Sequence, residues 1–151
     1  MTPSLAVPTL DALEAAMVAS DLPRVDCPVH HAFLPGIYCR QIHIPAGTLI
    51  TSMEHRFAHP FIISKGMIQV VSATEGSVFY GAPWCDITEP GTRRALYAVT
   101  DVVWTTFHAT DETDVEKIGE SILTPHFNAL LASNDPDAEA WRTSIPKIPA
   151  P

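Results

Sequence analysis

Residues 47–66 read Gly47-Thr48-Leu49-Ile50-Thr51-Ser52-Met53-Glu54-His55-Arg56-Phe57-Ala58-His59-Pro60-Phe61-Ile62-Ile63-Ser64-Lys65-Gly66. Two glycines bracket two short apolar runs, and the histidines His55 and His59 lie between the runs. A helix would place two residues at this spacing on one face. Helix is disfavoured here, because Pro60 follows directly and the flanking runs have strand composition. The pair is therefore predicted at a strand end and the next strand start, facing each other across a turn.

On both sides of this stretch, apolar and polar residues alternate with a period of two. Residues 37–44 alternate well enough for a strand that is closed by a turn at Gly47. Further short strands are predicted at residues 48–53, 61–64, 67–72, 77–80, 85–88, 94–99 and 102–108. The last two are expected to form a hairpin across Thr100-Asp101. Many short strands with regularly spaced turn signals indicate an antiparallel sandwich or barrel.

The two ends of the chain are predicted to be helical. Apolar residues at helical spacing indicate a helix at about residues 10–20, and Pro23 and Pro28 then predict a connecting arm over residues 21–35. Acidic residues from Asp111 to Asp114 precede a predicted helix at 114–123, where the helix dipole favours them. A second helix at 126–133, a turn near Trp141 and a Pro-rich tail are expected to follow.

We therefore expect one domain with three parts. Residues 1–35 form an N-terminal helix and arm, residues 36–110 form the barrel, and residues 111–151 form a C-terminal helical extension and tail. The chain of 151 residues, 46% hydrophobic and 17% charged, has the length and composition of a globular protein with a core.

Charge and cysteine content exclude several functional classes. The formal net charge of −8 argues against binding to nucleic acid or to an anionic membrane surface. The first basic residue is Arg24, so no signal peptide is predicted, and no apolar run has the length of a membrane span. Three cysteines without CxxC spacing are typical of a reduced intracellular protein, although one disulfide with a free thiol stays open. A cytoplasmic protein is expected.

The stretch at residues 47–66 and the turn near residue 90 resemble the two motifs of the cupin superfamily. The first cupin motif, Gly-x5-His-x-His-x3-4-Glu-x6-Gly, fits residues 47–66 without a gap. Its two histidine positions fall on Met53 and His55, its glutamate position on His59 and its closing glycine on Gly66. The second motif, Pro-x-Gly-x-x-His-x-x-x-Asn, falls on residues 89–98, where its turn is altered and its histidine position is Arg94.

The wider sequence is similar to small cupin-like proteins of unknown function that are often encoded in phage genomes. The features that carry this similarity are residues 45–49, the histidine pair, residues 91–94 and residues 104–114. The resemblance implies an all-β, cupin-type antiparallel barrel, or jelly roll, with an N-terminal helix and a C-terminal helical extension. It also implies that the protein is a homodimer. If the protein is encoded by a phage, its expected location is the cytoplasm of the bacterial host.

The ligand positions depart from the cupin pattern. Met53 would suit soft Cu(I) better than a hard divalent ion. Arg94 would repel a metal, so it is expected either to clamp a carboxylate or phosphate or to pair with an acidic neighbour such as Glu89. His108 is the remaining histidine that could supply a third imidazole, since the expected hairpin would place it opposite Thr92 near the rim of the barrel.

The predicted metal ligands are therefore His55, His59 and His108, and a divalent Fe, Ni, Zn or Mn ion is the expected cofactor. This set resembles the sites of non-haem iron dioxygenases in ligand count. For His55 and His59 the alternative is a pair of polar loop residues, and for His108 it is a strand-end histidine bonded near Thr110.

Three functions follow from these alternatives. The first is a metal-dependent cupin, which as an enzyme would have a dioxygenase-like or isomerase-like activity. The second is a metal-free module that binds a small anionic molecule through Arg94, Met53 and the histidines. The third is a non-catalytic structural or phage accessory protein in which the barrel serves as a scaffold. The fold does not choose among them, because function depends on the residues of the site.

Overall fold

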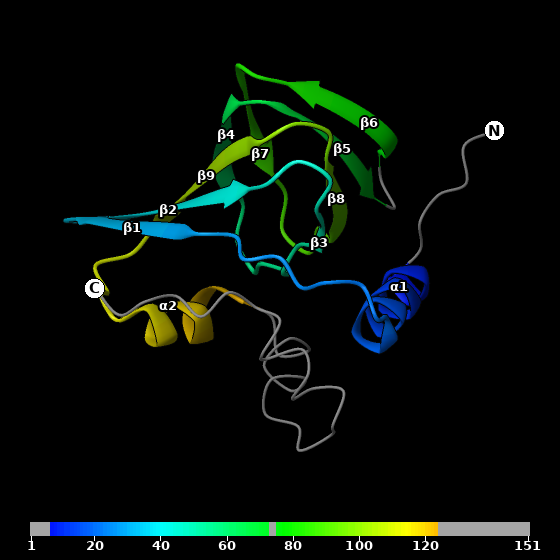
Figure 1. Ribbon diagram of the computed structural model, residues 1–151. Coiled ribbons are helices and arrows are strands. Elements are labelled where there is room, and N and C mark those ends of the chain that lie inside the picture. Colours follow the sequence, from blue (N-terminus) through cyan, green and yellow to red (C-terminus); the bar gives the residue numbers. More distant parts are fainter. Residues whose placement is uncertain (1–6, 73–74, 124–151) are drawn as a thin grey trace.

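Two antiparallel sheets form the body of the protein (Figure 1). The computed structural model describes residues 7–72 and 75–123, with side chains from Leu10 onward. The elements are α1 (Val7–Ala19), β1 (Val29–Leu34), β2 (Ile37–Ile44), β3 (Leu49–Thr51), β4 (His59–Lys65), β5 (Met67–Ser72), β6 (Gly76–Gly81), β7 (Trp84–Thr88), β8 (Arg94–Ala98), β9 (Val102–Ala109) and α2 (Val115–Ile122). The five-stranded sheet has the order β1-β2-β9-β4-β7, and the four-stranded sheet has the order β3-β8-β5-β6.

The core lies between the two sheets and follows from the alternation of side chains along each strand. In β4, the residues His59, Phe61 and Ile63 are buried while Pro60 and Ile62 point outward. The Phe61 ring stacks on Trp104 of β9 with centroids 4.5 Å apart. Cys27, which precedes β1, and residues of both sheets complete the cluster, the latter being Ile44, Ile68, Val70, Leu96, Ala98 and Val102. A sheet with one buried face requires this period of two.

Several predicted elements are confirmed. The strands over residues 37–44 and 67–72 have the predicted bounds, and α2 lies within the predicted helix at 114–123. Asp114 caps α2, since its side chain accepts hydrogen bonds from the backbone N–H groups of Glu116 and Lys117. The predicted helix at 126–133 and the turn near Trp141 lie outside the described residues.

Two predictions were wrong. The arm predicted over residues 21–35 contains β1, which pairs with β2 from Val29 to Leu34. Pro28 does not prevent this, because it precedes the first strand residue and β1 is an edge strand. The hairpin predicted across Thr100-Asp101 is absent from the described part of the chain, since β8 pairs with β3 and β5 whereas β9 pairs with β2 and β4. The turn instead carries the chain from one sheet to the other.

Two ion pairs of Arg93 attach the helix α1 to the barrel. Nη1 of Arg93 lies 2.6 Å from Oδ1 of Asp11, and its Nη2 lies 2.8 Å from Oε1 of Glu14. The side chains of Arg93 and Glu14 are buried, and Asp11 is half exposed. Among the described residues, no helix is long and apolar enough to cross a membrane.

Gly66 is required by both its backbone conformation and its surroundings. Its φ is +89°, and a Cβ there would lie 2.1 Å from the carbonyl oxygen of Asp101. Gly47, at the other end of the central stretch, has a φ of +79° but open space around a Cβ. A side chain at Gly47 would therefore meet only conformational strain, whereas one at Gly66 would meet both strain and steric overlap.

We predict that Gly66→Ala destabilises the protein more than Gly47→Ala does. The left-handed conformation alone costs a non-glycine residue about 1–2 kcal/mol, so both variants lose this amount of unfolding free energy. Only Gly66→Ala also forces the backbone at Asp101 to move. Urea unfolding of both variants and the wild type checks this, and equal losses of unfolding free energy would show that the contact at Asp101 is unimportant.

Candidate metal centre

Three histidines converge at one end of the inner face of the five-stranded sheet. The β4–β9 register pairs Phe61 with Thr106, so His59 and His108 lie two residues further along the same ladder and face each other. His55 comes from the segment between β3 and β4. Ring centroids are 4.6 Å apart for His59 and His108, 4.4 Å for His55 and His59, and 5.3 Å for His55 and His108.

The distances suit one metal ion. Each histidine offers one ring nitrogen, and these nitrogens lie within 4.8 Å of one another. Histidine ligands bind a transition metal at about 2.0–2.1 Å, so small rotations of the side chains bring all three nitrogens to a common ion. His59 and His108 are only 5% and 6% exposed, and His55 is partly buried.

Backbone carbonyls select the tautomer of two of these rings. The Nδ1 atom of His55 lies 3.2 Å from the carbonyl oxygen of Met53, and Nδ1 of His59 lies 3.3 Å from that of Phe57. A carbonyl can only accept, so Nδ1 carries the proton in each ring and Nε2 keeps its lone pair. This is the arrangement of metal-binding histidines, whose second nitrogen is held by an outer partner.

His108 is held differently. Its Nε2 lies 3.0 Å from the hydroxyl oxygen of Thr106, two residues earlier on β9. A hydroxyl can donate or accept, so this contact orients the ring and is compatible with either tautomer. Stacking on Tyr38 of β2, with centroids 5.8 Å apart, supports the other side of the ring.

Burial keeps the three imidazoles neutral at physiological pH. Desolvation, followed by the charges of neighbouring groups, lowers the pKa of His55 to about 4 and that of His108 to about 3. Desolvation also lowers the pKa of His59. Protons therefore do not compete with a metal for these nitrogens near neutral pH.

The segment that carries His55 is fixed by the end of α2. His55 forms an isolated β-bridge with Leu123, and the backbone N–H of Arg56 donates to the carbonyl of Ile122 over 2.8 Å. On the other side, the N–H of Gly91 donates to the carbonyl of His55 over 2.9 Å. The C-terminal helix therefore positions a candidate ligand at the end of the barrel.

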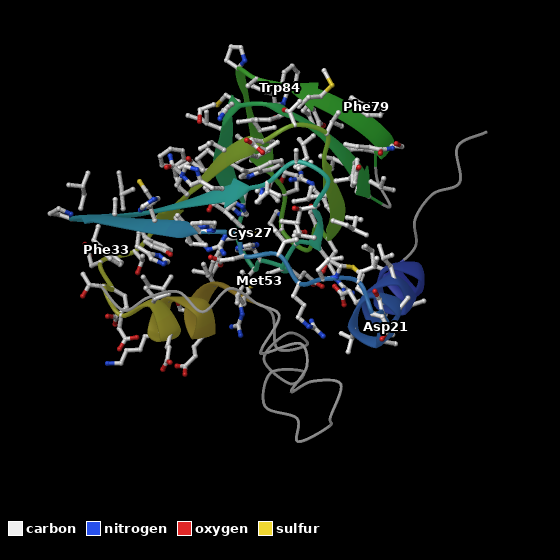
Figure 2. The ribbon with its side chains drawn as sticks, in the orientation of Figure 1. Asp21, Cys27, Phe33, Met53, Phe79 and Trp84 are labelled. Atoms are coloured by element: carbon white, nitrogen blue, oxygen red, sulfur yellow. The ribbon has the colours of Figure 1, made fainter. Side chains whose placement is uncertain are left out.

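The other predicted site residues differ in their surroundings. Met53 is partly buried and lies toward the end of the barrel near α2, away from Phe79 and Trp84 (Figure 2). Its carbonyl supports His55, whereas a ligand role for its sulfur stays a prediction. The predicted ion pair of Arg94 with Glu89 is not formed. The buried Arg94 donates instead from Nη1 to Oγ1 of Thr88 over 3.1 Å, and its Cζ lies 5.4 Å from the centroid of Phe61.

The sequence did not identify Arg40 as a residue of the barrel interior. It lies on β2 between Tyr38 and Ile42, both of which share its face of the strand, and Tyr38 is only 2% exposed. The alternation over residues 37–44 already placed Arg40 on one face with these residues. What the sequence did not reveal is that this face is the inner one. His108 was predicted correctly as a neighbour of His55 and His59, but from a hairpin that does not exist.

We predict that the metal-free protein loses stability below neutral pH because of these buried histidines. An unfolded histidine has a pKa near 6.5, so the unfolded state binds more protons than the folded state between this value and the lowered folded pKa. The stabilising contribution is complete above pH 6.5 and is lost as the pH falls toward 4 and 3.

For His108 the expected loss between pH 7 and pH 5 is about 2 kcal/mol. Urea unfolding with a chelator present, at both pH values, measures it, and His108→Gln should show a correspondingly smaller dependence on pH. The same dependence in both proteins would contradict a neutral, desolvated His108.

Solved structures show which fold this architecture represents. No protein-family model and no curated protein matches the sequence. The structure of ectoine synthase from P. lautus is similar over 70% of this chain and 79% of its own, with 13% identity and a TM-score of 0.54. An uncharacterized conserved protein with a double-stranded β-helix domain, from Klebsiella pneumoniae, is similar over 62% and 84%, with 11% identity and a TM-score of 0.50.

An RmlC-like cupin family protein with a double-stranded β-helix fold, from Methanocaldococcus jannaschii, is similar over 61% of this chain and 86% of its own. Its identity is 10% and its TM-score 0.48. Identities in this range concern the fold alone. Together with the two antiparallel sheets, the likenesses to the ectoine synthase and Klebsiella structures show that the chain has the all-β, cupin-type double-stranded β-helix fold that its central motif predicts.

Proposed function

We propose that this protein is a metal-dependent cupin in which His55, His59 and His108 hold one divalent transition-metal ion. The observation that supports the proposal most strongly is the convergence of three neutral imidazoles from three separate segments. A histidine in a core is ordinarily satisfied by neighbouring groups, whereas here two rings keep an Nε2 lone pair after their Nδ1 atoms are bonded.

The donor set favours some metals over others. Three imidazoles without a carboxylate suit Zn, Fe and Ni better than Mn, which prefers oxygen ligands. Three protein ligands also leave coordination positions open for water or a substrate, which is typical of catalytic rather than structural sites. A bound ion would supply Lewis acidity or, for iron, redox chemistry. Dioxygenase-like and isomerase-like activities are both compatible with this set, and substrate screens on the loaded protein distinguish them.

The residues of the chain itself have defined roles in this proposal. The carbonyls of Met53 and Phe57 orient two ligands, and Thr106 orients the third. The end of α2 holds the segment of His55. Burial keeps the ligands unprotonated, so metal affinity should change little between pH 6 and 8, since only protons on the ligands would weaken it.

A second candidate is a metal-free module for a small anion, and the surroundings of Arg94 favour it. This buried guanidinium has no carboxylate partner among the described residues. Stabilisation by an anion that survives treatment with a chelator would support this function, whereas stabilisation that needs the metal supports the first.

We predict that protein purified without a His tag contains about one metal ion per chain, and that His55→Ala/His59→Ala contains almost none. Inductively coupled plasma mass spectrometry on both proteins measures the content and identifies the element. His30→Ala is the matched control, because His30 is exposed on β1 and outside the cluster. Absence of metal from the wild type, even after incubation with Ni, Zn, Fe and Mn, would end the proposal.

A further inference from the structure

Two arginines that face the interior of the barrel form no ion pair among the described residues. Arg94 belongs to β8 of the four-stranded sheet, and Arg40 belongs to β2 of the five-stranded sheet. Within the described residues, the ion pairs are those of Arg93 with Asp11 and Glu14, and neither Arg40 nor Arg94 takes part. Adjacent arginines thus have opposite environments, because Arg93 is paired with two carboxylates and Arg94 with none.

Arg94 keeps hydrogen-bonding capacity that the protein does not use. Its side chain is more than nine-tenths buried, and Nη1 donates to Thr88. Its Nε is buried without a partner among the described residues, and Nη2 has no hydrogen bond there either. These two atoms form one edge of the guanidinium, the edge that binds a carboxylate or phosphate in a bidentate manner. A buried donor without a partner is costly, so an anion at this edge would relieve the cost.

Arg40 is placed on the opposite flank of the histidines. The β2–β9 and β4–β9 registers align Arg40 with Thr106 and Phe61 in one row across the sheet, next to the row that holds His108 and His59. Arg40 has no hydrogen bond or ion pair among the described residues. Its pKa is lowered by desolvation, and the groups that oppose this are the weakly acidic Tyr38 and Cys27.

The strand registers place His59 and His108 between the two arginines. Thr88, which receives the hydrogen bond of Arg94, is aligned with His59 in the β4–β7 register. One guanidinium therefore flanks the cluster on the β2 side and the other on the β7 side.

We propose that this interior binds a small molecule with two anionic groups, such as a dicarboxylate, which spans the histidine cluster with one group at Arg40 and the other at Arg94. The inference extends the proposed metal site, and a bound divalent cation would add to the same positive charge. The arginines would nevertheless recognise the anion in the absence of metal, so the two proposals can be tested separately.

The charge of the interior supports a dianion over a neutral ligand. Arg40 and Arg94 bring two positive charges to the interior. The described residues near Arg40 supply no carboxylate, and Glu75 and Asp86, whose charges act on Arg94, form no ion pair with it. Charges buried without a counter-charge are unfavourable, so a complementary anion is bound more favourably there than in water. A monoanion would engage one arginine and leave the other unpaired.

The test compares straight-chain dicarboxylates from malonate to adipate with monocarboxylates of matched length. Isothermal titration calorimetry is performed on wild type, Arg40→Gln, Arg94→Gln and Arg24→Gln, each with metal and with chelator. Arg24→Gln is the matched control, because Arg24 is exposed and the variant loses the same charge. We expect one length of dicarboxylate to bind best, with affinity about tenfold or more weaker in Arg40→Gln and in Arg94→Gln and unchanged in Arg24→Gln.

A ligand that contacts both arginines should also show a distinct dependence of its affinity on the two side chains. Affinity for the best dicarboxylate should depend on both arginines, whereas affinity for a monocarboxylate should depend on one of them at most. Equal binding of dicarboxylates and monocarboxylates, or equal binding by wild type and both interior variants, would overturn the inference. If a glutamine variant does not fold, Arg→Lys at the same position keeps the charge without the bidentate edge and should weaken binding in the same direction.

The outcomes also separate this inference from the proposed function. Dicarboxylate binding that persists with chelator, in a protein that holds no metal, would support the anion site and reject the metal centre. Stoichiometric metal without selective dicarboxylate binding would support the metal centre and reject the anion site.

Discussion

Pairing between β4 and β9 is the constraint on which the rest of this structure depends. The register that stacks Phe61 on Trp104 in the core also places His59 beside His108 at the end of the same ladder. A shift of one residue between these strands would put His59 and His108 on opposite faces of the sheet, because side chains alternate along a strand. Formation of the core and assembly of the candidate metal centre are thus the same event, and only His55 must be added from outside the ladder.

The inner face of the five-stranded sheet is apolar at one end and polar at the other, and the candidate ligands lie at the polar end. Ile63 and Trp104 occupy the apolar part, while the row of Tyr38, His108, His59 and Thr88 closes the polar end. Burial at that end favours neutral imidazoles, and two guanidinium groups nearby form no ion pair with the described residues. Both properties favour ligands from outside the chain, a cation for the lone pairs and an anion for the arginines.

The sequence predicted the fold and the histidine cluster better than it predicted the connections. Turn glycines and alternation located most strands of the barrel, because both are local signals. The strand β1 was missed since prolines in the preceding segment suggested irregular structure, although an edge strand tolerates Pro28 before its first residue. The separation of β8 from β9 into different sheets depends on long-range pairing, which no local pattern encodes. For the same reason Arg40 was not recognised as an interior residue.

The central claim is that His55, His59 and His108 bind one metal together. X-ray absorption at the K edge of the bound metal, in wild type and in His108→Gln, tests this claim most directly. We predict a wild-type spectrum with about three imidazole nitrogens at about 2.0–2.1 Å, and one imidazole fewer in the variant. A wild-type spectrum without imidazole scattering, or an identical spectrum in the variant, would contradict the account and place the metal elsewhere in the protein.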